Sequence, residues 1–253
     1  MKDKILLIIP VKGDSRRLPK KWRAELVPGV TLLDRAMDRC QDFEVLCEAR
    51  GDALCFSVVV TESSEVMDYI KVRGGKYVGR PKELAVEERL HATMSHVVGE
   101  FPEFTTLMVT LPTSPLATSW DLMSGYKMFA SSGRQRVMSM TNVGQMPHWC
   151  LRKRRGRLTP SAAETVETWY WWNDMGLEDM YKCNGAVYVT DVEDWKEKPQ
   201  QYVSGLLCYE MPPERGVDVD TELDLLLAQA IYRRDYGEKS DPRKPGGEGV
   251  GQA

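Results

Sequence analysis

The chain alternates between short apolar runs and longer segments in which apolar residues recur at helical spacing. Runs of strand length without polar interruption are typical of strands covered on both faces. They predict strands near residues 4–11, 56–63, 105–111, 136–143, 184–190 and 206–211. The helical spacing predicts helices at residues 31–49, 64–75, 79–101, 119–133, 192–198 and 220–236. This alternation predicts an α/β fold of three layers, with helices on both faces of a mostly parallel, twisted sheet.

The alternation stops between Gly144 and Lys182. The segment HWCLRKRRGRLTP has the pattern of a hairpin with a glycine turn, and ETWYWWNDMGLEDMY is rich in aromatic residues. We predict one domain over residues 1–236, in which 144–182 is a small excursion that packs on a second subunit of a homodimer. Residues 237–253 combine glycine, proline and charge with few apolar side chains, which predicts a disordered tail.

Composition excludes several classes of protein. The chain has 253 residues, 42% of them hydrophobic, and a formal net charge of -3. No apolar run approaches the roughly 18 residues of a membrane span. The six cysteines form no C-x-x-C pair, which favours free thiols in a cytoplasmic protein. Because positive charge is clustered locally on an acidic chain, we expect a small anionic ligand rather than a nucleic acid.

A basic cluster follows the first predicted strand, in the sequence VKGDSRRLPKKW. Ligands of open parallel sheets bind beyond the carboxyl ends of the strands, so this loop lies where a substrate would bind. Gly13 allows close approach of the backbone, and Ser15 offers a hydroxyl and an amide. The loop lacks the patterns of a Walker loop and of a dinucleotide-binding loop. Its cations suit a nucleoside triphosphate, although a solvated basic loop is the alternative; they are Lys12, Arg16, Arg17, Lys20 and Lys21.

Five segments, in order, resemble the motifs of one family. They are IPVKGDSRRLPKK, GRPKELA, LPTSPL, NGAVYV and GVDVDTELDLLLA. Together they resemble the acylneuraminate cytidylyltransferases (CMP-sialic acid synthetases), which are related to the CMP-Kdo synthetases. The absence of an aspartate from LPTSPL favours the sialate branch. The resemblance implies a Rossmann-like nucleotidyltransferase fold and a place in nucleotide-sugar biosynthesis.

The resemblance also implies a reaction. The anomeric hydroxyl of a sialic-acid-like 2-keto sugar acid attacks the α-phosphorus of CTP, and the products are the CMP-sugar and pyrophosphate. Asp218 and Asp220 match the two aspartates that hold Mg²⁺ in the family, and residues two apart in an extended segment point to one side. The alternative is that Asp220 caps the last helix, with Asp224 in solvent. The sequence assigns no general base.

The resemblance also implies roles for residues that match functional positions of the family. Lys21 joins Asp218 and Asp220 as the catalytic set. The residues that match nucleotide-binding positions are Lys12, Gly13, Ser15, Arg16, Arg17, Lys21 and Arg80. Arg80, as an arginine before proline, also fits a surface loop. The residues that match the sugar site are Leu111, Thr113, Ser114, Lys182 and Asn184.

Three positions depart from the family pattern. Leu111 replaces a glutamine that contacts the sugar, Trp22 replaces an asparagine, and Leu90 lies where a serine contacts the base. These departures leave two alternatives open. One is a nucleotidyltransferase that uses another nucleotide or a sugar 1-phosphate. The other is a non-catalytic, nucleotide-binding relative.

Overall fold

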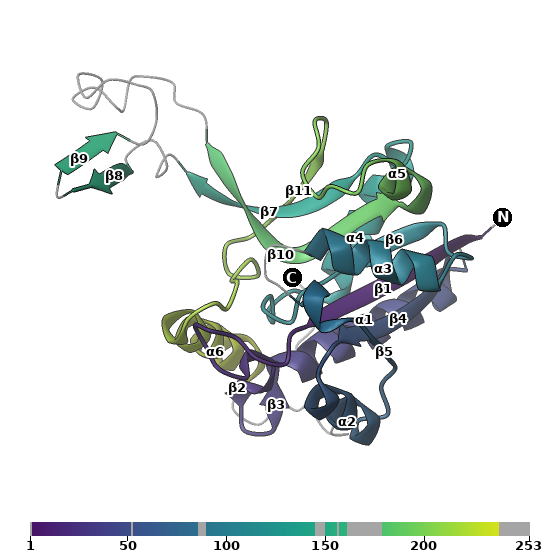
Figure 1. Ribbon diagram of the computed structural model, residues 1–253, viewed down its shortest axis with the longest axis horizontal. Helices are drawn as coiled ribbons and strands as arrows, with labels where there is room; N and C mark the ends of the chain where they lie inside the picture. The colour runs from purple at the N-terminus through teal and green to yellow at the C-terminus, as the bar shows by residue number, and fades with distance from the viewer. Residues whose placement is uncertain are drawn as a thin grey trace.

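A single mixed sheet organises the chain (Figure 1). The computed structural model describes residues 2–51, 53–85, 90–144, 150–155, 157–160 and 179–237. The sheet has the strand order β11-β7-β10-β6-β1-β4-β5. Its strands are β1 (Asp3–Val11), β4 (Ala53–Thr61), β5 (Tyr77–Gly79), β6 (Thr106–Val109), β7 (Val137–Gly144), β10 (Met180–Asp191) and β11 (Leu207–Met211). Neighbours are parallel except at β10, which runs antiparallel to both β6 and β7. The predicted mostly parallel sheet is confirmed.

Strand β1 shows why helices cover both faces. Its side chains alternate between two cores, because successive residues of a strand point to opposite faces. One core contains Ile5 and Leu7 and packs against α1 (Leu32–Arg50), α2 (Ser64–Val72) and α4 (Ser119–Ser131). The other contains Leu6 and Ile8 and packs against α3 (Leu90–Glu100) and α5 (Val192–Glu197). The predicted three-layer arrangement is therefore confirmed.

The prediction of one long helix at residues 79–101 is wrong in its first part. Strand β5 ends at Gly79, a single 3-10 turn follows at Lys82–Leu84, and α3 begins at Leu90. Pro81 between strand and turn keeps the residue before it out of the helical region. Residues 80–85 are thus a loop with one short turn in place of the expected helix.

A small third cluster brings the last helix to the loop after β1. Helix α6 (Glu222–Tyr236) packs on a hairpin of β2 (Glu25–Val27) and β3 (Val30–Thr31). Leu26, Val219 and Tyr232 are fully buried in this cluster. The sequence did not predict the hairpin. It holds the segment before α6 close to the basic loop, although the two are far apart in the chain.

The predicted hairpin in the excursion is confirmed. Strands β8 (Leu151–Arg154) and β9 (Arg157–Pro160) pair antiparallel, apart from the main sheet in Figure 1. The aromatic cluster at 169–172 and the tail at 238–253 lie outside the described residues. The packing of the excursion on a second subunit and the disorder of the tail therefore stay predictions.

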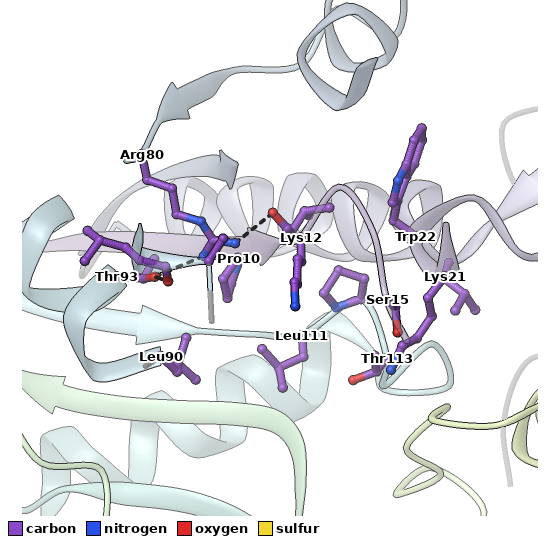
Figure 2. Close-up of a pocket in the computed structure, with 15 residues that line it drawn as sticks. Pro10, Lys12, Ser15, Lys21, Trp22, Arg80, Leu90, Thr93, Leu111 and Thr113 are labelled. Carbon is purple, nitrogen blue, oxygen red and sulfur yellow. Dashed lines mark hydrogen bonds between the residues drawn. The ribbon is translucent and has the colours of Figure 1, made fainter. Parts of the chain in front are cut away.

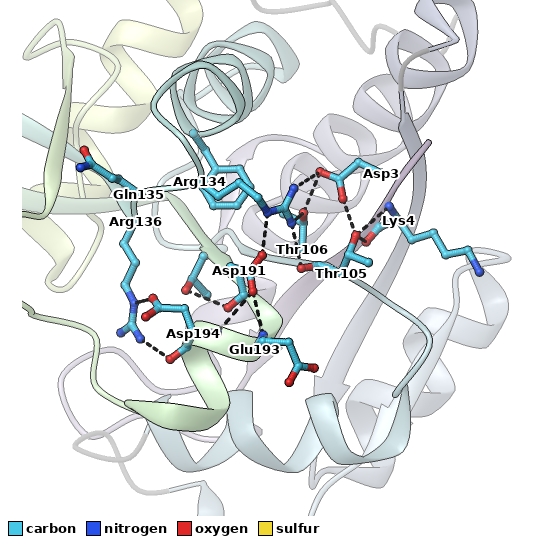
Figure 3. Close-up of polar contacts among 12 residues, drawn as sticks. Asp3, Lys4, Thr105, Thr106, Arg134, Gln135, Arg136, Asp191, Glu193 and Asp194 are labelled. Atoms are coloured by element: carbon cyan, nitrogen blue, oxygen red, sulfur yellow. Dashed lines mark hydrogen bonds and ion pairs between the residues drawn. The ribbon is translucent and has the colours of Figure 1, made fainter. Parts of the chain in front are cut away.

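At the opposite end of the sheet from the basic loop, Arg134 joins three strands (Figure 3). Its Nε lies 2.6 Å from Asp191 of β10, and one terminal nitrogen lies 3.0 Å from Asp3 of β1. The other terminal nitrogen donates to the Thr106 hydroxyl of β6 at 2.8 Å. Arg134 adopts a positive φ of 68° in the turn between α4 and β7. This cluster stabilises the sheet at a distance from the candidate site.

Two absences apply to the described residues. None of their helices combines the length and apolar character needed to cross a membrane. All six cysteines lie among them, and none forms a disulfide.

Candidate active site

The site lies where the chain order of the sheet reverses. From β1 the chain adds β4 and β5 on one side, whereas β6 pairs with the other side of β1. The loops after β1 and β6 diverge at such a point and leave a crevice at the carboxyl ends of the strands. A cavity of about 220 Å³ occupies this crevice (Figure 2). Its lining includes Lys12, Ser15, Lys21, Trp22, Arg80, Leu90, Leu111 and Thr113.

Gly13 is the point at which the basic loop approaches its neighbour. A Cβ atom at this position would lie 2.6 Å from Cβ of Ser63, closer than the two atoms can pack. The Gly13 amide donates to Glu62 at 2.8 Å, and the indole of Trp22 donates to the Gly13 carbonyl at 3.1 Å. The backbone thus approaches its protein neighbours closely at Gly13, and a role for this residue in nucleotide binding stays a prediction. Both polar groups of this residue are occupied within the protein.

Two cations of the loop meet one carboxylate of the segment before α6. Nζ of Lys21 lies 2.8 Å from one oxygen of Asp220, and a terminal nitrogen of Arg17 lies 2.9 Å from the other. Lys20 pairs instead with Glu65 at 2.8 Å, away from this carboxylate. The cations of the basic loop therefore point in different directions: Lys21 and Arg17 face Asp220, whereas Lys20 faces Glu65.

The carboxylate of Asp220 does not cap α6. Thr221 is the N-cap residue and forms a capping box with Asp224. The Asp220 amide also donates to Asp224, at 3.1 Å. Asp224 thus bonds three groups at the start of the helix instead of lying free in solvent, and the Asp220 carboxylate remains directed at the basic loop.

Asp218 lies beside the loop after β6. The Val219 amide donates to the Thr113 carbonyl at 2.7 Å, which ties the two segments together. Burial raises the pKa of Asp218, the nearby Asp220 raises it further, and a hydrogen bond from Thr113 with the charges of Lys182 and Lys21 opposes the rise. The charges of Asp220 and Lys21 thus act on Asp218, and a catalytic role for the three residues stays a prediction.

The donor set is compatible with Mg²⁺. Asp218 and Asp220 supply carboxylate oxygens, and Mg²⁺ commonly uses one or two carboxylates together with substrate phosphates. The described residues contain no group of three or more His, Cys, Asp or Glu residues that could hold a metal ion without substrate. An ion here would share Asp220 with Lys21 and Arg17 or displace them.

The other predicted nucleotide ligands are placed unequally. Lys12 and Ser15 line the cavity, but the Ser15 amide donates to Asp14 at 2.8 Å. Arg16 is exposed. The Arg80 side chain is only 5% exposed, which excludes its interpretation as a surface-loop arginine.

Two predicted sugar ligands use their polar groups inside the protein. The Ser114 hydroxyl donates to the Asn184 carbonyl at 2.7 Å. The Asn184 side chain accepts from Ser139 at 2.5 Å and donates to Thr141 at 3.0 Å. Lys182 is exposed, and its charge acts on Asp218. A sugar-binding role for this group stays a prediction.

Apolar side chains line the part of the cavity where the sequence departs from the family. Trp22, Leu90 and Leu111 all contribute to the lining. The position that a Gly185 Cβ would take lies 2.8 Å from a methyl carbon of Leu111, so the leucine is packed against the middle of β10. A ligand meets apolar surface at Leu111.

Sequence reasoning missed Arg39, a buried arginine of α1. Its guanidinium donates to the carbonyl of Ser114 at 2.6 Å and to the Thr110 hydroxyl at 2.7 Å, both in the loop after β6. Burial lowers the pKa of Arg39 to about 10. An arginine in an amphipathic helix gives no signal that it is buried. Glu62, which bonds both Gly13 and Arg80, was also missed, because a glutamate directly after a strand gives no signal that it is buried.

Comparison with known proteins shows which enzymes the chain resembles. No family model matches the chain. The N-acylneuraminate cytidylyltransferase of Escherichia coli O18:K1:H7 is 22% identical over 244 residues, which cover 95% of this chain and 55% of that protein. The CMP-N,N'-diacetyllegionaminic acid synthase of Legionella pneumophila is 22% identical over 241 residues, with 90% of this chain and 96% of that protein covered. The chain is thus similar over at least nine tenths of its length to enzymes named for the synthesis of CMP-linked sugar acids.

The chain spans about half the length of the first of these relatives and nearly all of the second. Solved structures show the same fold. CMP:2-keto-3-deoxy-manno-octonic acid synthetase complexed with CTP superposes with a TM-score of 0.66 at 13% identity, over 92% of this chain and 99% of that one. The 4-diphosphocytidyl-2C-methyl-D-erythritol synthase of Anaerococcus prevotii gives a TM-score of 0.54 at the same identity and coverage. The predicted nucleotidyltransferase fold is confirmed.

Proposed function

We propose that this protein is a cytidylyltransferase that couples CTP to a sialic-acid-like 2-keto sugar acid, giving the CMP-sugar and pyrophosphate. The observation that carries the proposal is the meeting of Lys21, Arg17 and Asp220 beside Asp218, at the edge of the cavity between β1 and β6. The relatives named for CMP-sialic and CMP-legionaminic acid synthesis support the choice of nucleotide and acid.

The reaction asks mainly for position and charge. An in-line displacement at phosphorus needs the attacking hydroxyl, the α-phosphorus and the leaving pyrophosphate held in order, with the growing negative charge balanced. Lys21 and Arg17 contact Asp220 in this structure and are only partly buried, at 16% and 57% exposure. Their side chains can turn to phosphate oxygens when a triphosphate enters, and Lys12 adds a third cation at the cavity wall.

We propose that Asp218 and Asp220 hold Mg²⁺ together with the triphosphate. When bound, the ion supplies positive charge to the phosphate oxygens and helps to fix the triphosphate. The contribution of the protein is to hold the two carboxylates on one short segment, which Thr113 and the capping box of α6 fix on either side.

We also propose a homodimer formed through residues 144–182, and light scattering at micromolar concentration tests it.

The test of the activity is pyrophosphate release with ATP, CTP, GTP and UTP against N-acetylneuraminate, diacetyllegionaminate, Kdo and a sugar 1-phosphate. We expect release with CTP and a nine-carbon acid. Greater release with another nucleotide or with the sugar 1-phosphate would favour the other nucleotidyltransferase reaction. Binding of CTP without release from any pair would identify a non-catalytic relative.

A further inference from the structure

Glu62, the residue after β4, contacts the basic loop with one carboxylate oxygen and Arg80 with the other. Oε1 accepts the Gly13 amide at 2.8 Å. Oε2 accepts Nε and a terminal nitrogen of Arg80 at 3.1 and 2.9 Å. Both side chains of the ion pair are largely buried, at 12% exposure for Glu62 and 5% for Arg80. Hydrogen bonds to an ionised group in such a place are stronger than those between neutral groups.

Most N–H donors of Arg80 form hydrogen bonds within the protein. A guanidinium has five N–H groups. Besides the two bonds to Glu62, Arg80 donates to the Val11 carbonyl at 3.1 Å and to the Thr93 hydroxyl at 3.0 Å (Figure 2). One N–H group is left for a ligand, and the positive charge is already balanced by Glu62. Arg80 therefore stabilises the end of β1 through the Val11 carbonyl. Because Glu62 balances its charge, Arg80 adds little net positive charge for a triphosphate.

The loop is also held from its other side. The indole of Trp22 donates to the Gly13 carbonyl at 3.1 Å, and its ring packs edge-on against Tyr69 at a centroid distance of 5.1 Å. Gly13 is thus held at both polar groups: its amide bonds to Glu62, and its carbonyl accepts from Trp22. Glycine is required there because a side chain would collide with Ser63.

From this geometry we propose that Glu62 is a positioning residue for the nucleotide. It fixes the backbone of the basic loop at Gly13 and holds Arg80 against the end of β1, so that Lys12, Ser15 and Lys21 line one cavity before the triphosphate arrives. The proposal rests on the proposed function, because it names the triphosphate as the group so positioned. It concerns the nucleotide and not the sugar acid.

Glu62→Gln is the test variant. A glutamine oxygen can accept either the Gly13 amide or Arg80, and its NH₂ group then meets N–H donors instead of an acceptor. We expect the loop to shift relative to the other phosphate ligands, and a misplacement of about 1 Å can cost roughly a hundredfold in rate. The expected result is a rise of about tenfold or more in the KM and calorimetric Kd for CTP with Mg²⁺, a lower kcat, and an unchanged KM for the sugar acid.

Glu44→Gln is the matched control. Glu44 also accepts a backbone amide, that of Ser57 at 2.5 Å, and pairs with a cation, Lys76 at 3.6 Å, but it lies away from the cavity. Equal kinetic constants in the two variants, or equal rises in both KM values, would overturn the proposal. Trp22→Phe, which keeps an aromatic ring but removes the bond to Gly13 and part of the bulk of the buried indole, gives a second measurement if Glu62→Gln does not fold. An unchanged CTP affinity in Trp22→Phe would then overturn the proposal.

Binding and turnover are measured on the same preparations, so the two proposals can fail separately. A wild type that binds CTP without releasing pyrophosphate contradicts the proposed activity, while the comparison of Kd values still decides the role of Glu62. Full wild-type activity with no difference between Glu62→Gln and Glu44→Gln contradicts the positioning role alone.

Discussion

The ammonium group of Lys21 lies 2.8 Å from a carboxylate oxygen of Asp220, a residue 199 positions further along the chain. The contact joins the loop after β1 to the segment before α6, and the packing of α6 on the β2–β3 hairpin maintains it. It also holds a cation beside a carboxylate that would otherwise repel Asp218 and an incoming triphosphate. Each charge of the pair therefore offsets the other.

Lys21→Ala tests the role of this cation. We expect kcat/KM for CTP to fall by about a hundredfold or more, because a charge aimed at phosphate oxygens matters most in the transition state. Stability should change by less than about 1 kcal/mol, since the ion pair is partly exposed. Steady-state kinetics and thermal unfolding measure the two effects.

Lys20→Asn is the control for Lys21→Ala, because Lys20 pairs with Glu65 and adopts a left-handed backbone that asparagine tolerates. We expect near-normal kinetics from the control. A Lys21→Ala protein that unfolds easily, but whose folded fraction is fully active, would show that the lysine is structural.

Leu111→Gln tests specificity for the sugar acid. Leu111 presents apolar surface to the cavity, where a polar group of a sugar without another partner would lose roughly 1–3 kcal/mol. The wild type should therefore prefer acids with a less polar group at this contact, by about tenfold to a hundredfold in kcat/KM. The glutamine variant should shift that preference toward N-acetylneuraminate.

The measurement for Leu111 compares N-acetylneuraminate with deoxy and diamino nine-carbon acids, in wild type and variant. Leu54→Gln, a change at an exposed leucine of β4, is the control. If the wild type already uses N-acetylneuraminate best and Leu111→Gln alters nothing, position 111 does not determine specificity.

Stability in acid should depend on the Arg134 cluster. Burial raises the pKa of Asp3, but hydrogen bonds from Thr105, Arg134 and Thr106 and the charge of Arg134 outweigh it, so the pKa lies below its usual value. The unfolded chain then binds a proton at a higher pH than the folded protein does, and acid favours unfolding. This contribution is present above the ordinary aspartate pKa of about 3.9 and is lost as the pH falls through the lower folded value.

Asp3→Asn measures that contribution. At neutral pH we expect the variant to lose roughly 1–3 kcal/mol of unfolding free energy, the range for hydrogen bonds to charged groups. Its stability should then fall less steeply than that of the wild type below about pH 4. Denaturant titrations across this range provide the measurement, and parallel curves for the two proteins would contradict the assignment.

The sequence predicted the parts of the fold that depend on continuous local patterns. The apolar run at residues 4–11 indicated a buried strand, and its position at the start of an α/β pattern placed the basic loop beside a ligand. Motif resemblance, and not periodicity, put Lys21 and Asp220 in one site. Their contact could not follow from spacing, because it depends on how α6 packs on a hairpin that the sequence did not reveal.

The polar residues behind the site were missed for a physical reason. Arg39 and Glu62 occupy positions where a charged side chain is usually solvated, and only tertiary packing buries them under the loops after β6 and β1. The direction of β10 was also not assigned, because a strand that follows a long excursion can return in either direction. The pairing of Tyr188 with Val109 shows that it returns antiparallel.

Pyrophosphate release from CTP with a nine-carbon 2-keto sugar acid at saturating Mg²⁺, compared between wild type and Asp220→Asn, tests the catalytic centre most directly. Asparagine keeps the size of the side chain and removes the charge that faces Lys21 and Arg17. We expect the wild type to release pyrophosphate and Asp220→Asn to be slower by about two orders of magnitude or more, with unchanged thermal unfolding. Near-normal release by Asp220→Asn would contradict the assignment of this carboxylate to catalysis.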